Sequence, residues 1–179
     1  MKQRVSVLGS NLSLSIEERE IPSPGPGEVL IQVKSVGVCG SDIHYFEHGR
    51  IADFVVESPL VLGHESSGVV AALGAGVEDI AVGTTVAMEP GVSCGHCHEC
   101  RLGRYNLCPE VEFFATPPID GAFCEYVVLP RDFVHPVPGH VSFDAAALLE
   151  PLSVGVWACQ KAEVSLGTRV LITGCGPIG

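Results

Sequence analysis

Leu60-Val61-Leu62-Gly63-His64-Glu65-Ser66-Ser67-Gly68 is the stretch from which the fold and the chemistry of this chain can be worked out. Its apolar and small residues predict β-strand on both sides of a glycine. Adjacent residues of a regular strand point to opposite faces of a sheet, so His64 and Glu65 could reach one ion only from an irregular bend. Gly63 could supply that bend, because glycine adopts backbone conformations closed to other residues.

The first 50 residues also favour strands. Residues 2–8 and 12–20 partly alternate apolar and polar side chains around Gly-Ser-Asn, which predicts a β-hairpin. The Pro/Gly run 22–27 must be a loop, and 28–38 alternates as a strand does. Residues 41–48 are expected to form one or two helical turns, with Ser41 or Asp42 as N-cap.

Strand character continues to residue 137 and then gives way to helix. Strands are expected at 60–73, 82–88, 122–129 and 132–137, whereas residues 92–118 show no periodicity. Ser142 is a plausible N-cap for a helix to Glu150, which Pro151 should break before a second helix over 153–162. A mainly β barrel followed by the first piece of an α/β domain is the predicted fold class.

Bulk composition narrows the function classes. Hydrophobic residues make up 46% of the 179 residues and charged residues 17%, so the chain can bury a substantial core. A net charge of −11 argues against nucleic acid or an anionic membrane as partner. Without a signal peptide or a membrane-spanning run, we expect a cytoplasmic protein, in which eight cysteines favour metal ligands or reactive thiols over disulfides.

The sharpest metal signature is a Cys-x2-Cys-x2-Cys-x7-Cys run. Structural zinc prefers four thiolates in a tetrahedron, and pairs two residues apart can present their sulfurs from one tight turn. A mixed set that includes His96 or His98, or two disulfides, remains an alternative. The site would be closed and structural, and would order a loop that has little apolar surface. Its ligands are predicted to be Cys94, Cys97, Cys100 and Cys108.

A second candidate site brings together Cys39, which follows a strand, and His64. Spacing alone does not link the two residues. A buried cysteine and an unrelated hydrogen-bonded histidine are an equally good interpretation of the residues themselves.

The chain resembles the zinc-containing medium-chain dehydrogenase/reductase family. The pattern Gly63-His64-Glu65-x2-Gly68-x5-Gly74-x2-Val77 matches that family's zinc alcohol dehydrogenase signature, and the four-cysteine run falls where the family has it. Residues 38–50 (Val-Cys-Gly-Ser-Asp-Ile-His-Tyr-Phe-Glu-His-Gly-Arg), 54–56 and 149–155 look most like sorbitol, xylitol and related polyol dehydrogenases.

This resemblance implies an enzyme with two zinc ions per chain, one structural and one catalytic. Cys39 and His64 would be ligands of the catalytic zinc, and Glu65 matches a ligand position of the polyol branch. Glu150 stands where many relatives carry a cysteine ligand, and would bind zinc or hold a zinc-bound water. From the residues alone, the less favoured alternative is that Glu150 is a salt-bridged carboxylate at a helix end.

The implied reaction is oxidation of a polyol secondary alcohol to a ketose, with zinc polarising the substrate oxygen and hydride passing to NAD or NADP. Ser41 and His44 match the family's proton relay, although Ser41 could be only a helix cap and His44 only a surface histidine. Tyr45 and Phe114 would line the substrate pocket. The other cysteines, including Cys124, Cys159 and Cys175, are interpreted as small packing residues.

The glycine motif Gly174-Cys175-Gly176-Pro177-Ile178-Gly179 follows a predicted strand at 169–173. Gly174, Gly176, Pro177, Ile178 and Gly179 would approach the pyrophosphate of the dinucleotide. Residues 1–150 would then be a GroES-like zinc-binding catalytic domain with a zinc lobe at 92–110, and 151–179 the start of an incomplete Rossmann domain.

A full Rossmann domain needs several more βα units, so we expect the 179 residues to be the N-terminal portion of a longer chain. The full-length enzyme would be a homodimer or homotetramer. Two alternatives remain: a related zinc dehydrogenase acting on threonine, galactitol or a simple alcohol, or a non-catalytic, zinc-stabilised GroES-like scaffold.

Overall fold

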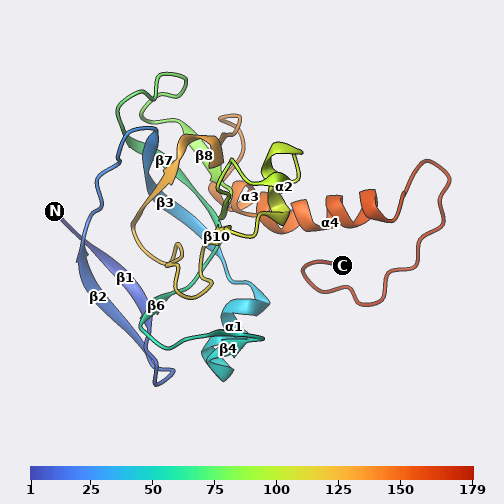
Figure 1. The fold of residues 1–179 in the computed structure, drawn as a ribbon, viewed down its shortest axis with the longest axis horizontal. Helices are drawn as coiled ribbons and strands as arrows, with labels where there is room; N and C mark the ends of the chain where they lie inside the picture. The colour runs from blue at the N-terminus through green and yellow to red at the C-terminus, as the bar shows by residue number, and fades with distance from the viewer.

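The computed structural model describes all 179 residues and is built around a five-stranded antiparallel sheet. The strand order is β11-β3-β7-β8-β12, and Figure 1 shows the sheet curling through the centre of the molecule. Each strand lies within or close to a predicted stretch, so the predicted β character is confirmed. The strands are β3 (Glu28–Gly37), β7 (Glu65–Leu73), β8 (Thr85–Met88), β11 (Tyr126–Pro130) and β12 (Val134–Pro136).

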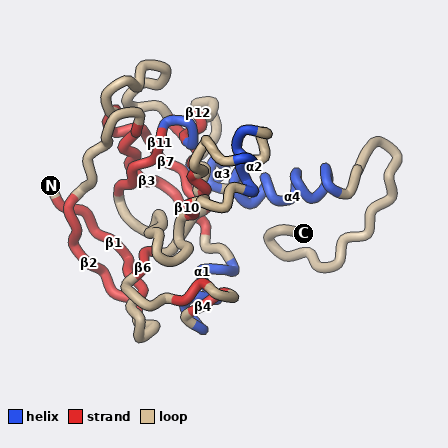
Figure 2. The backbone as a smooth tube through the Cα atoms, viewed as in Figure 1, coloured by secondary structure: helices blue, strands red, loops and turns tan.

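A smaller sheet of order β2-β1-β6 packs beside the first (Figure 1). It contains the predicted hairpin, β1 (Lys2–Leu8) and β2 (Leu14–Glu20), with β6 (Leu60–Val61) on the other side of β1. Two short antiparallel pairs complete the β structure (Figure 2), namely β4 (Arg50–Ile51) with β5 (Phe54–Val55) and β9 (Gly91–Val92) with β10 (Glu112–Phe113).

The core lies on the concave face of the large sheet. Alternate residues of β3, β7, β8 and β11 meet there, and Val29, Ile31, Val86 and Leu129 are at most 1% exposed. This alternation is the period of two that the sequence shows, since every second strand residue faces the same side. The large sheet therefore carries the main core, and Cys39, His64 and Glu65 lie where its strands β3 and β7 meet at their ends.

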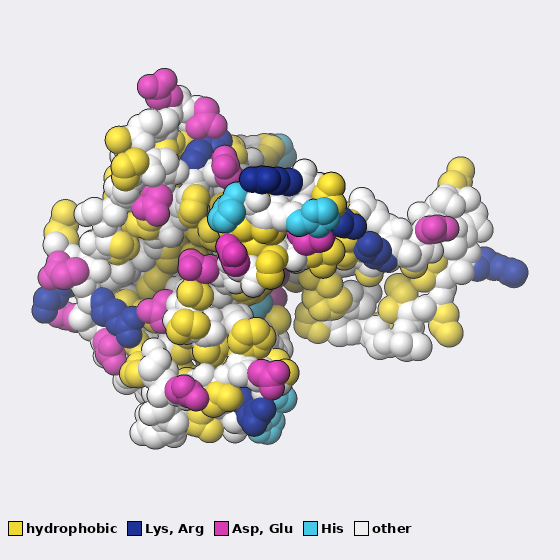
Figure 3. Space-filling view, viewed as in Figure 1, with side chains coloured by type: hydrophobic (Ala, Val, Ile, Leu, Met, Phe, Trp, Pro, Cys, Tyr) yellow, Lys and Arg dark blue, Asp and Glu magenta, His cyan; other side chains and the backbone are white.

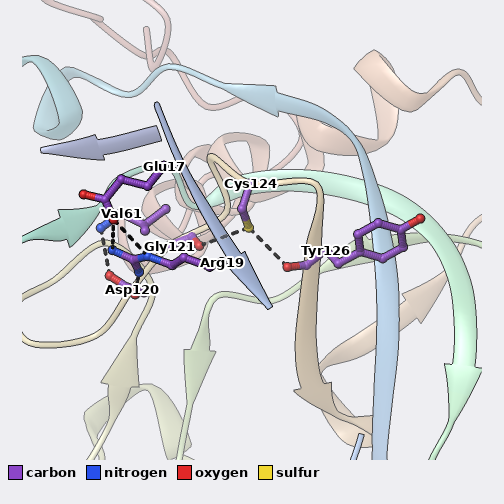
Figure 4. A network of polar contacts seen from close by, with 7 residues as sticks. All are labelled: Glu17, Arg19, Val61, Asp120, Gly121, Cys124 and Tyr126. Atoms are coloured by element: carbon purple, nitrogen blue, oxygen red, sulfur yellow. Dashed lines mark hydrogen bonds and ion pairs between the residues drawn. The ribbon is translucent and has the colours of Figure 1, made fainter. Parts of the chain in front are cut away.

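A polar network fastens the hairpin to the loop before β11 (Figure 4). Arg19 Nη1 donates to Asp120 Oδ2 at 2.8 Å, and Asp120 Oδ1 accepts the backbone N–H of Val61 at 2.8 Å. Four residues on, the thiol of Cys124 lies 3.3 Å from the Tyr126 carbonyl oxygen. Burial raises the pKa of the Cys124 thiol to about 12, so the expectation that Cys124 is a packing residue agrees with its place in the fold.

Four α-helices accompany the sheets: α1 (Gly40–His48), α2 (His98–Arg101), α3 (Phe143–Ala147) and α4 (Leu149–Lys161). Single 3₁₀ turns occur at Tyr105–Leu107 and Arg131–Phe133. No helix is long and apolar enough to cross a membrane.

The start of α1 differs from the prediction. Its N-cap is Cys39, not Ser41 or Asp42. Asp42 is the third residue of the helix, and its carboxylate accepts the Cys39 backbone N–H at 2.9 Å. In a capping box, the side chain of the N3 residue accepts the backbone N–H of the N-cap residue, as Asp42 does here. Ser41 is not the N-cap and has no capping role.

The boundary between α3 and α4 also differs. Ser142 caps α3 as predicted, because its Oγ accepts the Ala145 N–H at 3.1 Å. The break falls at Leu148, however, and Pro151 lies inside the first turn of α4. A proline is tolerated there because the N–H groups of the first turn have no intrahelical partner.

Beyond its first turn, α4 projects from the barrel, and hydrophobic side chains lie along it and the segment that follows (Figure 3). Trp157 is 48% exposed, and Cys159 and Cys175 are exposed, so the prediction that these two cysteines are packing residues is wrong. The strand predicted at 169–173 is absent. A strand exists only through hydrogen bonds to a neighbour, and no other segment bonds to these residues here.

Candidate functional site

Cys39, His64 and Glu65 converge where β3 ends and β7 begins, two neighbouring strands inside the large sheet. Cys39 lies between β3 and α1, and His64 and Glu65 lie at the junction of β6 and β7. Their ligand atoms all lie within 4.8 Å of one another. The convergence follows from strand pairing, because β3 and β7 are antiparallel and Gly37 is paired with Glu65. Thiolate, imidazole and carboxylate form a donor set that suits zinc.

Gly63 provides the bend that the sequence predicted. Its φ is +87°, in the left-handed region, and it separates β6 from β7. A Cβ at this position would lie 2.6 Å from the ring of Phe123. The bend allows two consecutive residues, His64 and Glu65, to face the same point, which a regular strand forbids.

The histidine of this cluster has an unsatisfied nitrogen. The side chain of His64 is 9% exposed, and its Nδ1 has no hydrogen-bond partner. The nearest carboxylate oxygen, on Asp42, is 4.0 Å away, too far for a hydrogen bond. A buried nitrogen without a partner costs free energy, so His64 Nδ1 needs a partner that the chain does not supply. A metal ion held by the cluster fits the residues present.

Gly37 leaves the space that Glu65 occupies. A Cβ on Gly37 would clash with Glu65 Oε2 and would lie 3.1 Å from the Glu65 Cβ. Gly37 does not have a positive φ, so this glycine is required for space and not for its backbone conformation. The close contact between Gly37 and the Glu65 side chain holds the Glu65 carboxylate against the end of β3, and Glu65 is 8% exposed.

Asp42 is a functional residue that the sequence reasoning missed. Its Oδ2 accepts the Cys39 backbone N–H, and its Oδ1 accepts the Gly63 backbone N–H at 2.8 Å. The residue is 3% exposed. One buried carboxylate thus ties the segment that carries Cys39 to the segment that carries His64. The only hint in the sequence was an acidic residue three positions after Cys39, where a helix would begin.

Glu150 lies beside the cluster but outside the set within 4.8 Å. It is in the first turn of α4 and is partly buried. Burial raises the pKa of its carboxyl, His64 lowers it and Glu65 raises it further. It forms no ion pair, so the salt-bridged interpretation of Glu150 has no support in the structure.

The residues predicted for the proton relay and the substrate pocket differ in how deeply they are buried. Ser41 is partly buried and His44 is exposed, and they lie three residues apart on α1. Tyr45 is 3% exposed and packs with Leu8 and other apolar residues, and burial raises the pKa of its hydroxyl. Phe114, 8% exposed, belongs to the main core cluster.

Phe113 is the aromatic residue that lies against the candidate ligands. Its ring is 5.6 Å from that of His64, centroid to centroid. The sequence pattern did not distinguish it from its neighbour, because residues 92–118 have no periodicity.

The four-cysteine loop forms a second, closed cluster. Cys94, Cys97, Cys100 and Cys108 bring their sulfurs within 4.8 Å of one another. The Cys94–Cys100 and Cys97–Cys108 sulfurs are 4.0 and 3.9 Å apart, close to the ~3.8 Å edge of a tetrahedron with 2.3 Å zinc–sulfur bonds. No disulfide joins any two of the four cysteines in the structure.

Backbone groups of this loop already point at the sulfurs. The N–H groups of Cys94, Cys97 and Cys100 each lie 3.4–3.5 Å from a neighbouring cysteine sulfur. His96 Nδ1 instead contacts the Cys94 carbonyl oxygen at 2.8 Å, and the side chain of His96 is 71% exposed. The geometry thus favours four sulfurs, although His96 and Glu110 also approach Cys94 as a possible mixed set.

A hollow of about 480 Å³ lies between the hairpin and β3, away from both clusters. Arg4, Lys34 and Cys124 are among its lining residues, and none of the predicted ligands is. The glycine motif lies beyond α4 (Figure 1), is exposed throughout and has a positive φ at Gly174.

Residues 25–139 match the family described as Alcohol dehydrogenase GroES-like domain, and the chain belongs to that family. The resemblance to zinc-containing dehydrogenases of the polyol branch is confirmed. The chain is 53% identical to sorbitol dehydrogenase of Gallus gallus over 166 residues, covering 93% of this chain and 47% of that protein. It is 47% identical to sorbitol dehydrogenase of Bacillus subtilis over 176 residues, covering 98% of this chain and 50% of that protein.

Among solved structures, a short chain alcohol dehydrogenase (rspB) of E. coli CFT073, complexed with NADH, superimposes with a TM-score of 0.89 at 38% identity. The match covers 99% of this chain and 50% of that one. The chain therefore spans about half the length of the curated relatives it matches.

Proposed function

We propose that this chain is the zinc-binding N-terminal portion of an NAD(P)-dependent oxidoreductase that interconverts a polyol secondary alcohol and a ketose. The convergence of Cys39, His64 and Glu65, with Glu150 beside them, carries the proposal. Relatives named sorbitol dehydrogenase, of about 50% identity, support the choice of a polyol over threonine, galactitol or a simple alcohol.

In this proposal Cys39, His64, Glu65 and Glu150 hold or face a catalytic zinc ion, and Cys94, Cys97, Cys100 and Cys108 hold a structural one. When bound, zinc supplies Lewis acidity at the alcohol oxygen and the nicotinamide supplies a hydride acceptor. Glu150, whose pKa is raised by burial, would hold a water molecule beside the zinc ion or join its ligands.

The chain's own residues position the substrate and move its proton. Ser41 accepts the hydroxyl proton and passes it to His44, which is exposed and can release it to water. The two lie at i and i+3 on α1, where side chains are neighbours. Tyr45 and Phe114 remain our proposed substrate-pocket residues. Since both are buried, they would act by shaping the pocket wall.

The domain organisation follows from the same proposal. Residues 1–150 form the zinc-binding domain, with the lobe at 92–110, and 151–179 begin a Rossmann domain whose pyrophosphate contacts are Gly174, Gly176, Pro177, Ile178 and Gly179. A reducing, cytoplasmic compartment suits the eight free thiols. The complete enzyme would be a homodimer or homotetramer.

Metal analysis of the purified chain tests the proposal. We expect two zinc ions per chain, one lost in Cys39→Ser and the other in Cys94→Ser. The complete polypeptide that contains this segment should oxidise sorbitol or xylitol with NAD or NADP. One zinc per chain, lost only in Cys94→Ser, would instead support a zinc-stabilised scaffold without catalysis.

A further inference from the structure

Two histidines form a pair on the exposed face of α1. His44 and His48 are four residues apart, so one helical turn places both rings on the same face. Their ring centroids are 4.5 Å apart, with planes inclined at 70°. Both residues are exposed, and the His48 side chain is 56% exposed. The two imidazoles are therefore adjacent and reachable from solvent.

The nitrogens of this pair are free for a ligand. Neither ring makes a hydrogen bond within the chain, and the nearest charged group is the Glu47 carboxylate, 3.8 Å from His48 Nε2. His48 is also the last residue of α1, and Gly49 is the C-cap of the helix. The carbonyl end of a helix carries partial negative charge, and together with Glu47 it favours a cation.

We propose that His44 and His48 form a bidentate site for a divalent transition-metal ion, separate from both cysteine-containing clusters. Imidazole nitrogen suits nickel, copper and zinc ions, and two histidines at i and i+4 on a helix are a known chelating arrangement. The exposed rings can turn so that one nitrogen of each reaches a common ion at about 2.0–2.1 Å. Water molecules complete the coordination.

The site has a consequence that rests on the proposed function. A neutral imidazole nitrogen has one lone pair, and coordination uses it. If His44 is the outer group of the proton relay, a metal ion bound to it removes the acceptor for the Ser41 proton. Excess transition metal should then inhibit proton release while both zinc clusters remain filled.

Nickel binding to the zinc-loaded chain tests the site directly. Isothermal titration calorimetry with Ni²⁺ should show one exchangeable site, and His48→Asn should weaken its affinity at least about tenfold, since one ligand then replaces a chelate. The matched control is His140→Asn, which removes another exposed histidine and should leave binding unchanged. Unchanged binding in His48→Asn, or loss of binding in His96→Asn instead, would overturn the proposal.

A second measurement separates this site from the proposed activity. In the complete polypeptide, Ni²⁺ should inhibit polyol oxidation, and His48→Asn should retain basal activity and resist inhibition. If nickel binds through His48 but no polyol is oxidised, the metal site stands and the proposed function fails. If polyol is oxidised and inhibition is the same in His48→Asn, the link between the pair and the relay is refuted.

Discussion

The carboxylate of Asp42 accepts the backbone N–H of Gly63 at 2.8 Å, across 21 residues of sequence. The other oxygen of the same carboxylate accepts the Cys39 backbone N–H at 2.9 Å. A single buried side chain therefore sets the distance between the turn that carries Cys39 and the bend that carries His64. The geometry of the cluster therefore depends on a residue that is not one of its three side chains.

Replacing Asp42 should let the turn that carries Cys39 and the bend that carries His64 move apart. Asp42→Ala leaves two N–H groups without an acceptor, and we expect the free energy of unfolding to fall by about 2–5 kcal/mol. One zinc equivalent should be lost with it. Asp42→Asn keeps one accepting oxygen and should lie between Asp42→Ala and the parent. Urea denaturation and metal analysis measure both effects, with the exposed Asp53→Ala as control. A control as unstable as Asp42→Ala would contradict this account.

Gly37→Ala should displace Glu65 without straining the backbone. The added Cβ would meet the Glu65 side chain, and Gly37 does not have a positive φ. We expect loss of affinity for the zinc ion of the Cys39 cluster, with the four-cysteine zinc retained. Gly139→Ala, where a Cβ meets open space, is the control. Competition with a chelator reads the affinity, and equal behaviour of the two variants would show that the close approach is unimportant.

The four-cysteine site can be distinguished from the mixed alternative by two variants. Cys94→Ser should remove one zinc ion per chain and make residues 92–110 sensitive to protease, because the loop has few apolar contacts of its own. His96→Asn should leave the zinc content unchanged, because the His96 ring contacts the Cys94 carbonyl oxygen and the Glu110 carboxylate. Zinc loss in His96→Asn would favour the mixed set. Cys159→Ser, at an exposed cysteine, controls for loss of a thiol.

Cys124 should make the fold sensitive to alkaline pH. Burial raises the pKa of its thiol to about 12, whereas in the unfolded chain a thiol ionises near ~8.5. Between these values the unfolded state holds fewer protons, so stability is fully present below about pH 8.5 and is lost as pH rises towards 12. One such group contributes a slope of about 1.4 kcal/mol per pH unit.

Urea denaturation at several pH values between 8.5 and 10.5 measures that slope. Cys124→Ala should reduce it relative to the parent, and Cys159→Ala should not. In the parent at pH 8, iodoacetamide should modify Cys159 and Cys175, which are exposed, well before Cys124. Early modification of Cys124 would show that its thiol is not protected.

The network in Figure 4 predicts that replacing Asp120 and replacing Arg19 will lower the free energy of unfolding by different amounts. Asp120→Ala removes the acceptor of the Val61 N–H and should cost about 1–3 kcal/mol. Asp120→Asn keeps that acceptor and should cost less. Arg19→Ala breaks an ion pair whose two side chains are partly exposed, and should cost under about 1 kcal/mol. Thermal or urea denaturation ranks the three, and a larger loss in Arg19→Ala would reverse the assignment.

The clearest strands were predictable because alternation is a local property, and β1 and β3 form where apolar residues recur at every second position. The Gly63 bend was predictable because His64 and Glu65 could share an ion in no other way. The cysteine lobe was predictable because its ligands lie within 15 residues of one another.

What could not be predicted depends on pairing between distant segments. Nothing in the spacing of Cys39 and His64 brings them together, and the register of β3 against β7 does so. Asp42 was predicted only as a possible N-cap, because its bond to the Gly63 N–H joins segments that are 21 residues apart. Pro151 was interpreted as a break because a proline in the first helical turn looks, in sequence, like one in the interior. The strand at 169–173 requires a neighbouring strand that this structure does not contain.

The register that pairs Gly37 with Glu65 implies that the two clusters need different lengths of chain before they can form. The four cysteines of the lobe can close around an ion as soon as residue 108 leaves the ribosome, because they need only one short loop. Cys39, His64 and Glu65 emerge earlier, yet they meet only after β7 has docked on β3, and Glu150 joins them later still. In the proposed function, the structural zinc ion would need only a local segment of chain, whereas the catalytic zinc ion would need the tertiary fold.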